Sequence, residues 1–125
     1  RFWEDIPLYP GVREDLWALA EDYNLLACTD RRWYSELRDE TAEILRRKDL
    51  PEITVDCIKG REKGQWAIGK NVHKFVEDSV PNILNMANMV RTPYLVDRPW
   101  NKGERVIPAN CFRGSWKDIV ANLLK

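Results

Sequence analysis

The sequence lacks the features of a membrane-spanning, secreted or zinc-stabilised protein. No run approaches the roughly 18 consecutive apolar residues of a membrane helix, and no signal-peptide pattern is present. Cys28, Cys57 and Cys111 are odd in number and far apart, so they do not form a disulfide framework. Together with His73 they also lack the close spacing of zinc ligands. We therefore expect an intracellular, cytoplasmic protein with free thiols and no membrane partner.

Net charge is also absent, because 20 basic residues balance 20 acidic ones. The two halves nevertheless differ. Residues 1–58 hold 8 Lys or Arg and 14 Asp or Glu, whereas residues 59–125 hold 12 and 6, so the halves carry −6 and +6. An anionic partner for the second half would explain this asymmetry, and so would mutual attraction of the halves across one fold.

The length of 125 residues suits one ordinary domain with a single core. The chain has no internal repeat and no low-complexity linker, and it begins at Arg1 rather than at a methionine. We therefore expect residues 1–125 to form one α/β domain that is the C-terminal fragment of a larger protein.

Apolar patterns of helix and strand alternate along the chain. An extended arm over 1–11 precedes helices predicted at 12–23, 31–49, 64–71 and 81–90 and strands predicted at 25–28, 53–58, 75–76 and 93–96. A last helix follows Ser115, which has capping-box spacing to Asp118. The alternation predicts a three-layer, Rossmann-like α/β domain with a parallel sheet flanked by helices.

The segment 59–71 has two interpretations. Its glycines could form a hairpin tip, with residues 65–69 as the return strand. Alternatively, a basic loop leads into a short helix with Trp66 and Ile68 facing inward. We favour the helix, because a following parallel strand at Phe75 requires a crossover connection.

Polar residues follow each predicted strand. In parallel sheets, ligands bind beyond the carboxyl ends of the strands. A hydroxyl, a lysine and a carboxylate pair at one edge could hold a phosphate and a magnesium ion. The candidates are Thr29 and Asp30, residues 59–63, Glu77 and Asp78, and residues 97–102.

Four stretches resemble the haloacid dehalogenase superfamily of phosphohydrolases, in particular its nucleotidase-like members. In chain order they read LYPGVREDLWALAEDYNLLACTDRR, GREKGQWA, KFVEDSVPNILNMA and TPYLVDRPWNKG, and the resemblance covers about residues 8–120. The first resembles the segment that leads to the second motif of the family, a Thr or Ser. The second resembles the stretch with the third-motif lysine, here Lys63, with Lys59 as a second choice. The third resembles the acidic fourth motif, and the fourth resembles the loop after the next strand.

The resemblance implies a magnesium-dependent phosphatase that hydrolyses a small phosphomonoester, such as a nucleotide, through an aspartyl-phosphate. Thr29 and Lys63 would be catalytic, and with Asp30 they would bind the phosphate. Glu77 and Asp78 would hold Mg²⁺. The first motif of the family, Asp-x-Asp, does not occur in this sequence. Either it precedes Arg1 in a longer protein, or the chain is not catalytic on its own.

Each candidate also has a purely local explanation. Thr29 could cap the next helix, and Lys63 could be a solvated loop lysine. Glu77 and Asp78 could simply favour the N-terminus of the helix that follows them.

Two other functions remain open. The first is a nucleic-acid-binding module in which Trp66 or Trp100 stacks on a base while basic side chains contact phosphates, namely Lys59, Arg61, Lys63, Lys70 and Lys74. The second is a protein-interaction domain that uses exposed tryptophans. The helical patterns predict that Trp17, Trp33 and Trp116 are mostly core, leaving Trp3, Trp66 and Trp100 as candidate hot spots.

Overall fold

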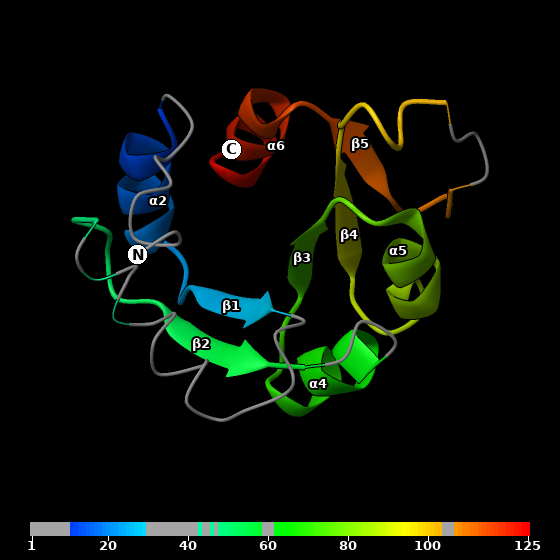
Figure 1. The fold of residues 1–125 in the computed structure, drawn as a ribbon, viewed down its shortest axis with the longest axis horizontal. Coiled ribbons are helices and arrows are strands. Elements are labelled where there is room, and N and C mark those ends of the chain that lie inside the picture. Colours follow the sequence, from blue (N-terminus) through cyan, green and yellow to red (C-terminus); the bar gives the residue numbers. More distant parts are fainter. Residues whose placement is uncertain (1–10, 30–42, 44–45, 47, 59–61, 104–106) are drawn as a thin grey trace. The chain divides into compact units, whose positions relative to one another are not determined.

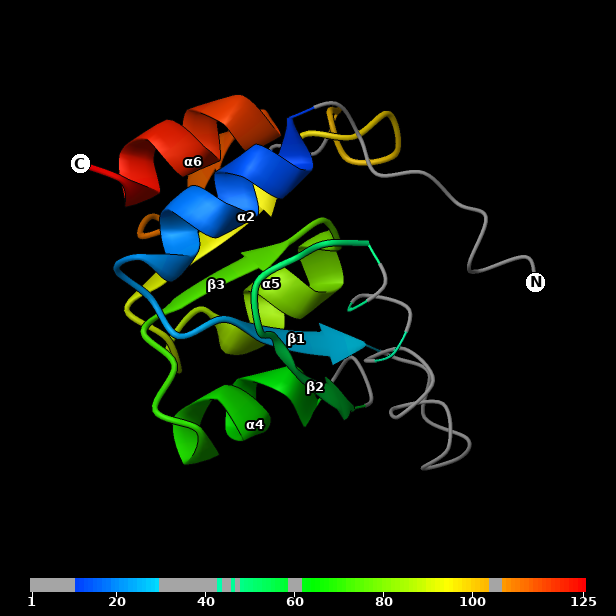
Figure 2. The same ribbon diagram turned by 90° about the vertical axis from the view of Figure 1, so that its left-hand side faces the viewer.

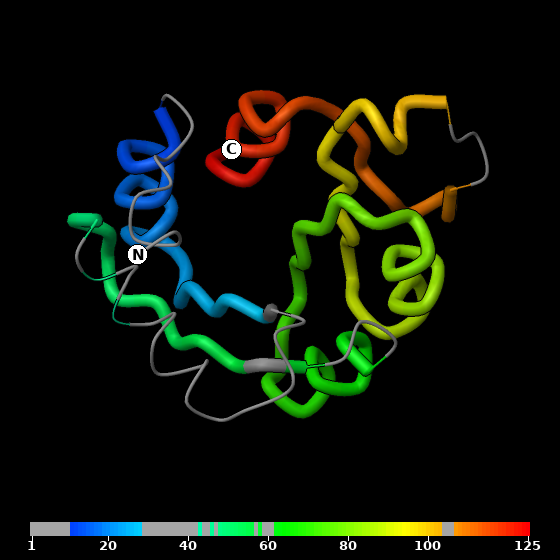
Figure 3. Tube along the Cα trace, in the orientation of Figure 1, coloured from blue at the N-terminus to red at the C-terminus, as the bar shows by residue number. Residues whose placement is uncertain are grey.

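The fold is described from a computed structural model for residues 11–29, 43, 46, 48–58, 62–103 and 107–125 (Figure 1). The expected N-terminal arm and most of the helix expected at 31–49 lie outside these residues. The chain divides into two compact units, one comprising residues 1–58 and 124 and the other residues 59–123 and 125. Figure 3 follows the backbone of each unit.

The first unit contains one described helix and one small parallel sheet. Helix α2 (Val12–Ala20) has Glu14 and Asp15 in its first turn, where carboxylates interact favourably with the helix dipole. Strands β1 (Leu26–Thr29) and β2 (Thr54–Cys57) pair in parallel, as Figure 2 shows. The buried apolar side chains of this unit, among the described residues, include Leu19, Leu50 and Val55.

In the second unit, the described residues form a three-stranded parallel sheet and three helices. Along the chain these are α4 (Lys63–Gly69), β3 (Lys74–Glu77), α5 (Val80–Met86), β4 (Thr92–Val96), β5 (Phe112–Gly114) and α6 (Trp116–Leu123). The strand order is β3-β4-β5, with every neighbouring pair parallel. Helix α5 provides the crossover from β3 to β4, as a parallel pair requires.

The core of the second unit lies where these helices meet the sheet. Helix α5 contacts β3, β4 and α4, while α6 contacts β4 and β5. The ring of Tyr94 packs against that of Phe112, with 5.6 Å between the ring centroids. Its hydroxyl donates to Oδ1 of Asn122 at 2.9 Å, so this buried polar atom has a hydrogen-bond partner. The buried apolar residues in the described part of this unit include Ala67, Phe75, Ile83, Met86, Val90, Pro93, Tyr94, Leu95, Val96, Ile119, Val120 and Leu123.

Local sequence signals define the ends of these helices. Asn71 adopts a positive φ of 59° after α4, and the amides of Asn71 and Val72 donate to the carbonyls of Ile68 and Ala67, which is a Schellman motif. At α6, the amide of Asp118 donates to Oγ of Ser115 and the amide of Ser115 donates to Oδ2 of Asp118. The predicted capping box is therefore confirmed.

The structure confirms an α/β chain with parallel strands, here in two sheets of two and three strands. It also confirms the short helix as α4, so the hairpin interpretation was wrong. Strand β5 was not predicted, because only three residues form it and they carry no alternating pattern.

Two predictions of burial were also wrong. Ile68 and Trp17 are exposed, and Ala67 faces the core instead of Ile68. A short helix covered on one side buries only the residues that meet its neighbour, and Trp17 uses its indole N–H to bind the main-chain oxygen of Asp49.

None of the helices in the described ranges has the length and the apolar run needed to cross a bilayer.

Candidate functional site

The candidate site is the carboxyl end of β3, where the strand gives way to α5. Glu77 is the last residue of the strand, and Asp78 and Ser79 connect it to the helix. Ser79 is the N-cap, and its hydroxyl accepts from the amide of Asn82 at 3.5 Å. Pro81 lies in the first turn, where its missing N–H is tolerated. The sequence therefore sets a sharp turn immediately after the paired carboxylates.

The carboxylate of Glu77 is buried and accepts four hydrogen bonds. Its Oε2 accepts from Nζ of Lys63 at 3.1 Å and from Nδ2 of Asn82 at 3.3 Å. Its Oε1 accepts from the amides of Asp78 at 3.1 Å and Ser79 at 3.3 Å. The side chains of Lys63 and Glu77 are only 9% and 8% exposed. A buried carboxylate requires such compensation, and here each oxygen accepts from two donors.

Lys63 reaches Glu77 from the first residue of α4. A lysine in the first turn of a helix is electrostatically unfavourable, because that end of the dipole is positive. The ion pair with Glu77 compensates for this placement. Next to Lys63, a Cβ on Gly64 would lie 2.4 Å from Sδ of Met89, so a larger residue there would force the Met89 side chain to move.

Asp78 differs from its neighbour because its carboxyl is only partly buried. Burial raises the pKa of Asp78 above its ordinary value of 3.8, and the adjacent Glu77 raises it further, while Arg98 opposes the shift. The carboxyl end of β3 thus holds two different carboxylates. The charge of Glu77 is compensated by donors within the protein, whereas the ionised form of Asp78 lacks full compensation.

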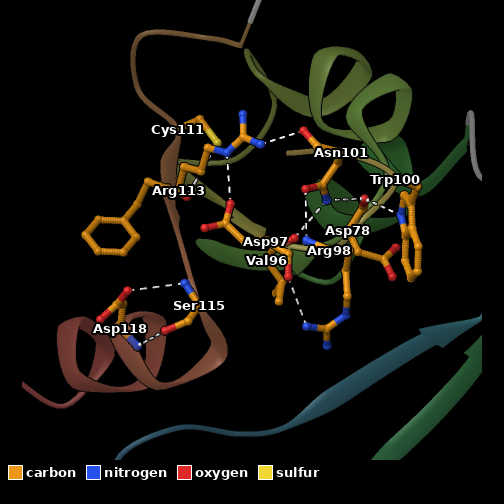
Figure 4. A network of polar contacts seen from close by, with 11 residues as sticks. Asp78, Val96, Asp97, Arg98, Trp100, Asn101, Cys111, Arg113, Ser115 and Asp118 are labelled. Atoms are coloured by element: carbon orange, nitrogen blue, oxygen red, sulfur yellow. Dashed lines mark hydrogen bonds and ion pairs between the residues drawn. The ribbon is translucent and has the colours of Figure 1, made fainter. Parts of the chain in front are cut away.

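A loop from the next strand fixes the backbone at Asp78. The buried side chain of Asn101 donates through Nδ2 to the carbonyl oxygens of Asp78 at 2.9 Å and Val96 at 2.8 Å. Its Oδ1 accepts from the amide of Arg98 at 3.0 Å. The indole N–H of Trp100 also donates to the Asp78 oxygen, at 3.2 Å (Figure 4). The ends of β3 and β4 are therefore joined by side-chain bonds.

Arg113 connects this loop to β5. Its Nε donates to Oδ1 of Asp97 at 2.9 Å, and its guanidinium also donates to the main-chain oxygen of Asn101 (Figure 4). The amide of Asp97 donates to the carbonyl of Gly114 at 2.8 Å. All three strands of the sheet thus contribute to one polar network at their carboxyl ends.

The structure brings together some of the predicted site residues. Lys63 contacts Glu77, and Asp78 lies next to them on the same rim. Thr29 ends β1 in the first unit, where its backbone pairs with Cys57, and its side chain is outside the described part of the structure. Asp30 also lies outside the described residues, as do residues 59–61 of the basic loop.

Sequence reasoning missed Arg113 and did not assign a role to Asn101. Asn101 fell within the candidate loop 97–102, but nothing in the pattern indicated that its side chain is buried. Arg113 lies 16 residues from Asp97, in a strand that the pattern did not predict. No local signal could have identified the bond from Asn101 to Asp78 or the bond from Arg113 to Asp97.

A magnesium site is compatible with Asp78 but less so with Glu77. In the described residues, no three His, Cys, Asp or Glu side chains gather at one point. Magnesium needs only one or two carboxylates, since waters and substrate phosphate complete its shell. Both oxygens of Glu77 already accept two hydrogen bonds each, whereas a cation beside Asp78 would stabilise its ionised form.

Comparison with known proteins identified no relative of this chain. No protein-family model, no curated protein and no solved structure matches the chain.

Proposed function

We propose that this chain is part of a magnesium-dependent phosphohydrolase of the haloacid dehalogenase type, acting on a small phosphomonoester such as a nucleotide. The observation that supports the proposal best is the buried Lys63–Glu77 ion pair beside Asp78 at the end of a parallel strand. Fixed cationic and anionic groups at such an edge are suited to phosphoryl transfer, where catalysis depends on positioning and charge stabilisation.

In this proposal Lys63 interacts with the phosphoryl group. An ammonium has three N–H donors, and the hydrogen bond to Glu77 uses one of them. In this proposal the other donors would bind a phosphoryl oxygen or orient the attacking carboxylate. Glu77 is then a positioning residue, because it holds the ammonium in place and compensates its charge when no phosphate is bound.

Asp78 would hold the magnesium ion, which would neutralise charge on the phosphoryl oxygens when bound. The main-chain oxygen of Asp78 is fixed by Asn101 and Trp100, so the position of its carboxylate is restricted before any ligand arrives. Such preorganisation reduces the cost of assembling the site.

The proposal also includes parts that lie beyond the described geometry. Thr29 and Asp30 would bind the phosphoryl oxygens, which requires the two sheets to combine in one three-layer, Rossmann-like domain. The attacking carboxylate would come from an Asp-x-Asp segment that this sequence does not contain.

The test is phosphatase activity of the protein that contains this chain. We expect hydrolysis of p-nitrophenyl phosphate and of nucleoside monophosphates that is abolished by EDTA and restored by Mg²⁺. The variant Asp78→Asn should lower kcat/KM by at least about 100-fold, because it removes a charge from the metal site.

Asp118→Asn is the matched control. It makes the same chemical change in the same unit, at an exposed capping residue of α6, and should leave kcat/KM within about twofold. Full activity of Asp78→Asn, or equal activity with EDTA and with Mg²⁺, would overturn the proposal.

A further inference from the structure

Trp100 is a large apolar side chain that the fold leaves uncovered. It is 68% exposed, the highest value among the exposed large hydrophobic residues of the described chain. Its only polar atom is nevertheless engaged, because the indole N–H donates to the main-chain oxygen of Asp78 at 3.2 Å. The ring is therefore held at the candidate site with most of its surface open to solvent (Figure 4).

The loop that carries Trp100 is itself braced. Main-chain amides of Asn101 and Lys102 donate to the carbonyl of Arg98 at 3.1 Å, which closes a tight turn around Pro99 and Trp100. The buried Asn101 side chain anchors this turn on β3 and β4, and Arg113 binds its main-chain oxygen. An aromatic ring fixed in this way loses little further freedom when a ligand stacks on it.

Core packing does not explain this arrangement. What distinguishes Trp100 from Trp17, which is also exposed and also donates its indole N–H to a main-chain oxygen, is its place: its hydrogen-bond partner is Asp78 of the candidate site. Proteins that bind single-stranded nucleic acids stack bases on exposed aromatic rings beside groups that contact phosphate, since every base offers a flat face for stacking.

We propose that Trp100 is the stacking platform for the base of a nucleoside monophosphate whose phosphate binds at Lys63, beside Asp78. This inference rests on the proposed phosphohydrolase function and specifies its substrate class. Stacking is tolerant of base identity, so the platform selects nucleotides over simple sugar phosphates and discriminates only weakly among bases.

The test compares two substrates that differ in the base, adenosine 5′-monophosphate and ribose 5-phosphate. In the protein that contains this chain, Trp100→Ala should lower the ratio of their kcat/KM values by about 5- to 100-fold, the range expected for one lost stacking contact. The loss should lie in KM for the nucleotide. The ratio cancels any displacement of Asp78 that affects both substrates equally.

Two further variants separate stacking from other effects. Trp100→Phe keeps a ring but loses the indole N–H, so it should retain most of the preference for the nucleotide. Trp17→Ala is the matched control, because Trp17 is also exposed and also donates its indole N–H to a main-chain oxygen, that of Asp49 at 2.9 Å. It should leave the ratio unchanged.

Binding measured by calorimetry distinguishes this inference from the proposed function. Suppose that the protein hydrolyses neither substrate, but Trp100→Ala selectively weakens binding of adenosine 5′-monophosphate over ribose 5-phosphate. That result would support base stacking on Trp100 and overturn the proposed phosphatase function. If both substrates are hydrolysed and Trp100→Ala leaves the ratio unchanged, or lowers both values alike, the platform is overturned and the phosphatase stands.

Discussion

Two ion pairs of the second unit are alike in distance and differ in their surroundings. Lys63–Glu77 joins α4 to β3 at 3.1 Å, and Arg113–Asp97 joins β5 to the loop after β4 at 2.9 Å. The side chains of the first pair are 9% and 8% exposed, whereas those of the second are 21% and 32% exposed. Similar geometry therefore occurs in two different dielectric environments.

Burial, rather than distance, decides what each pair contributes. The exposed pair Arg46–Glu43 has the shortest separation of the three, 2.7 Å, yet water screens it most, so we expect the smallest effect from its removal. Glu77, by contrast, depends on its four donors, because water cannot replace any that is lost. The pair with the longest separation, Lys63–Glu77, should thus contribute most, and the pair with the shortest separation, Arg46–Glu43, should contribute least.

The largest effect should follow from Lys63→Met, which leaves Glu77 buried without its cation. We expect a loss of about 3–5 kcal/mol in the free energy of unfolding, measured by urea denaturation. The double variant Lys63→Met with Glu77→Gln should recover a substantial part of this loss, because no uncompensated charge remains. A loss below about 1 kcal/mol in the single variant would contradict the contrast between the two pairs.

Arg113→Gln should have an intermediate effect. Asp97 can regain water when its partner is removed, so we expect a loss of about 1 kcal/mol by the same denaturation measurement. Arg46→Gln is the matched control and should cost only a few tenths of a kcal/mol. If Arg113→Gln destabilised the protein as much as Lys63→Met, partial exposure would not be the controlling variable.

Asp78→Asn should have a small effect on stability, and in the opposite direction. Because the folded pKa of Asp78 is raised above 3.8, its ionised form costs stability at neutral pH, and this cost disappears as the pH falls below 3.8. In EDTA, the melting temperature of the variant should therefore match or exceed that of the parent at pH 7. The difference should vanish near pH 3.5. A variant that is less stable than the parent at pH 7 would show that Asp78 serves the fold.

The elements of the fold were largely predictable because their signals are local. The capping box at Ser115 and Asp118 spans three residues, and the short helix α4 ends where Asn71 can adopt a positive φ. Strand β5 could not be predicted in this way. Its three residues form a strand because they pair with the edge of β4 and because Arg113 binds Asp97 at that edge.

The candidate site was predicted as a set of residue types and not as an arrangement. The acidic pair after a strand and the lysine before a helix were identified from the sequence, and the structure pairs Lys63 with Glu77. The division of roles between Glu77 and Asp78 was not visible, since it depends on which carboxylate Lys63 and Asn82 reach. The participation of Thr29 stays a prediction.

Among the described residues, the sequence by itself determined most of the helices and strands and several helix ends, because each depends on a local pattern, and their alternation along the chain determined that the strands run parallel. Only the tertiary structure decided which charges are buried, which partners satisfy them and that Trp100 stays uncovered beside Asp78. Desolvation of a side chain depends on segments distant in the chain, and no local pattern records where those segments will lie.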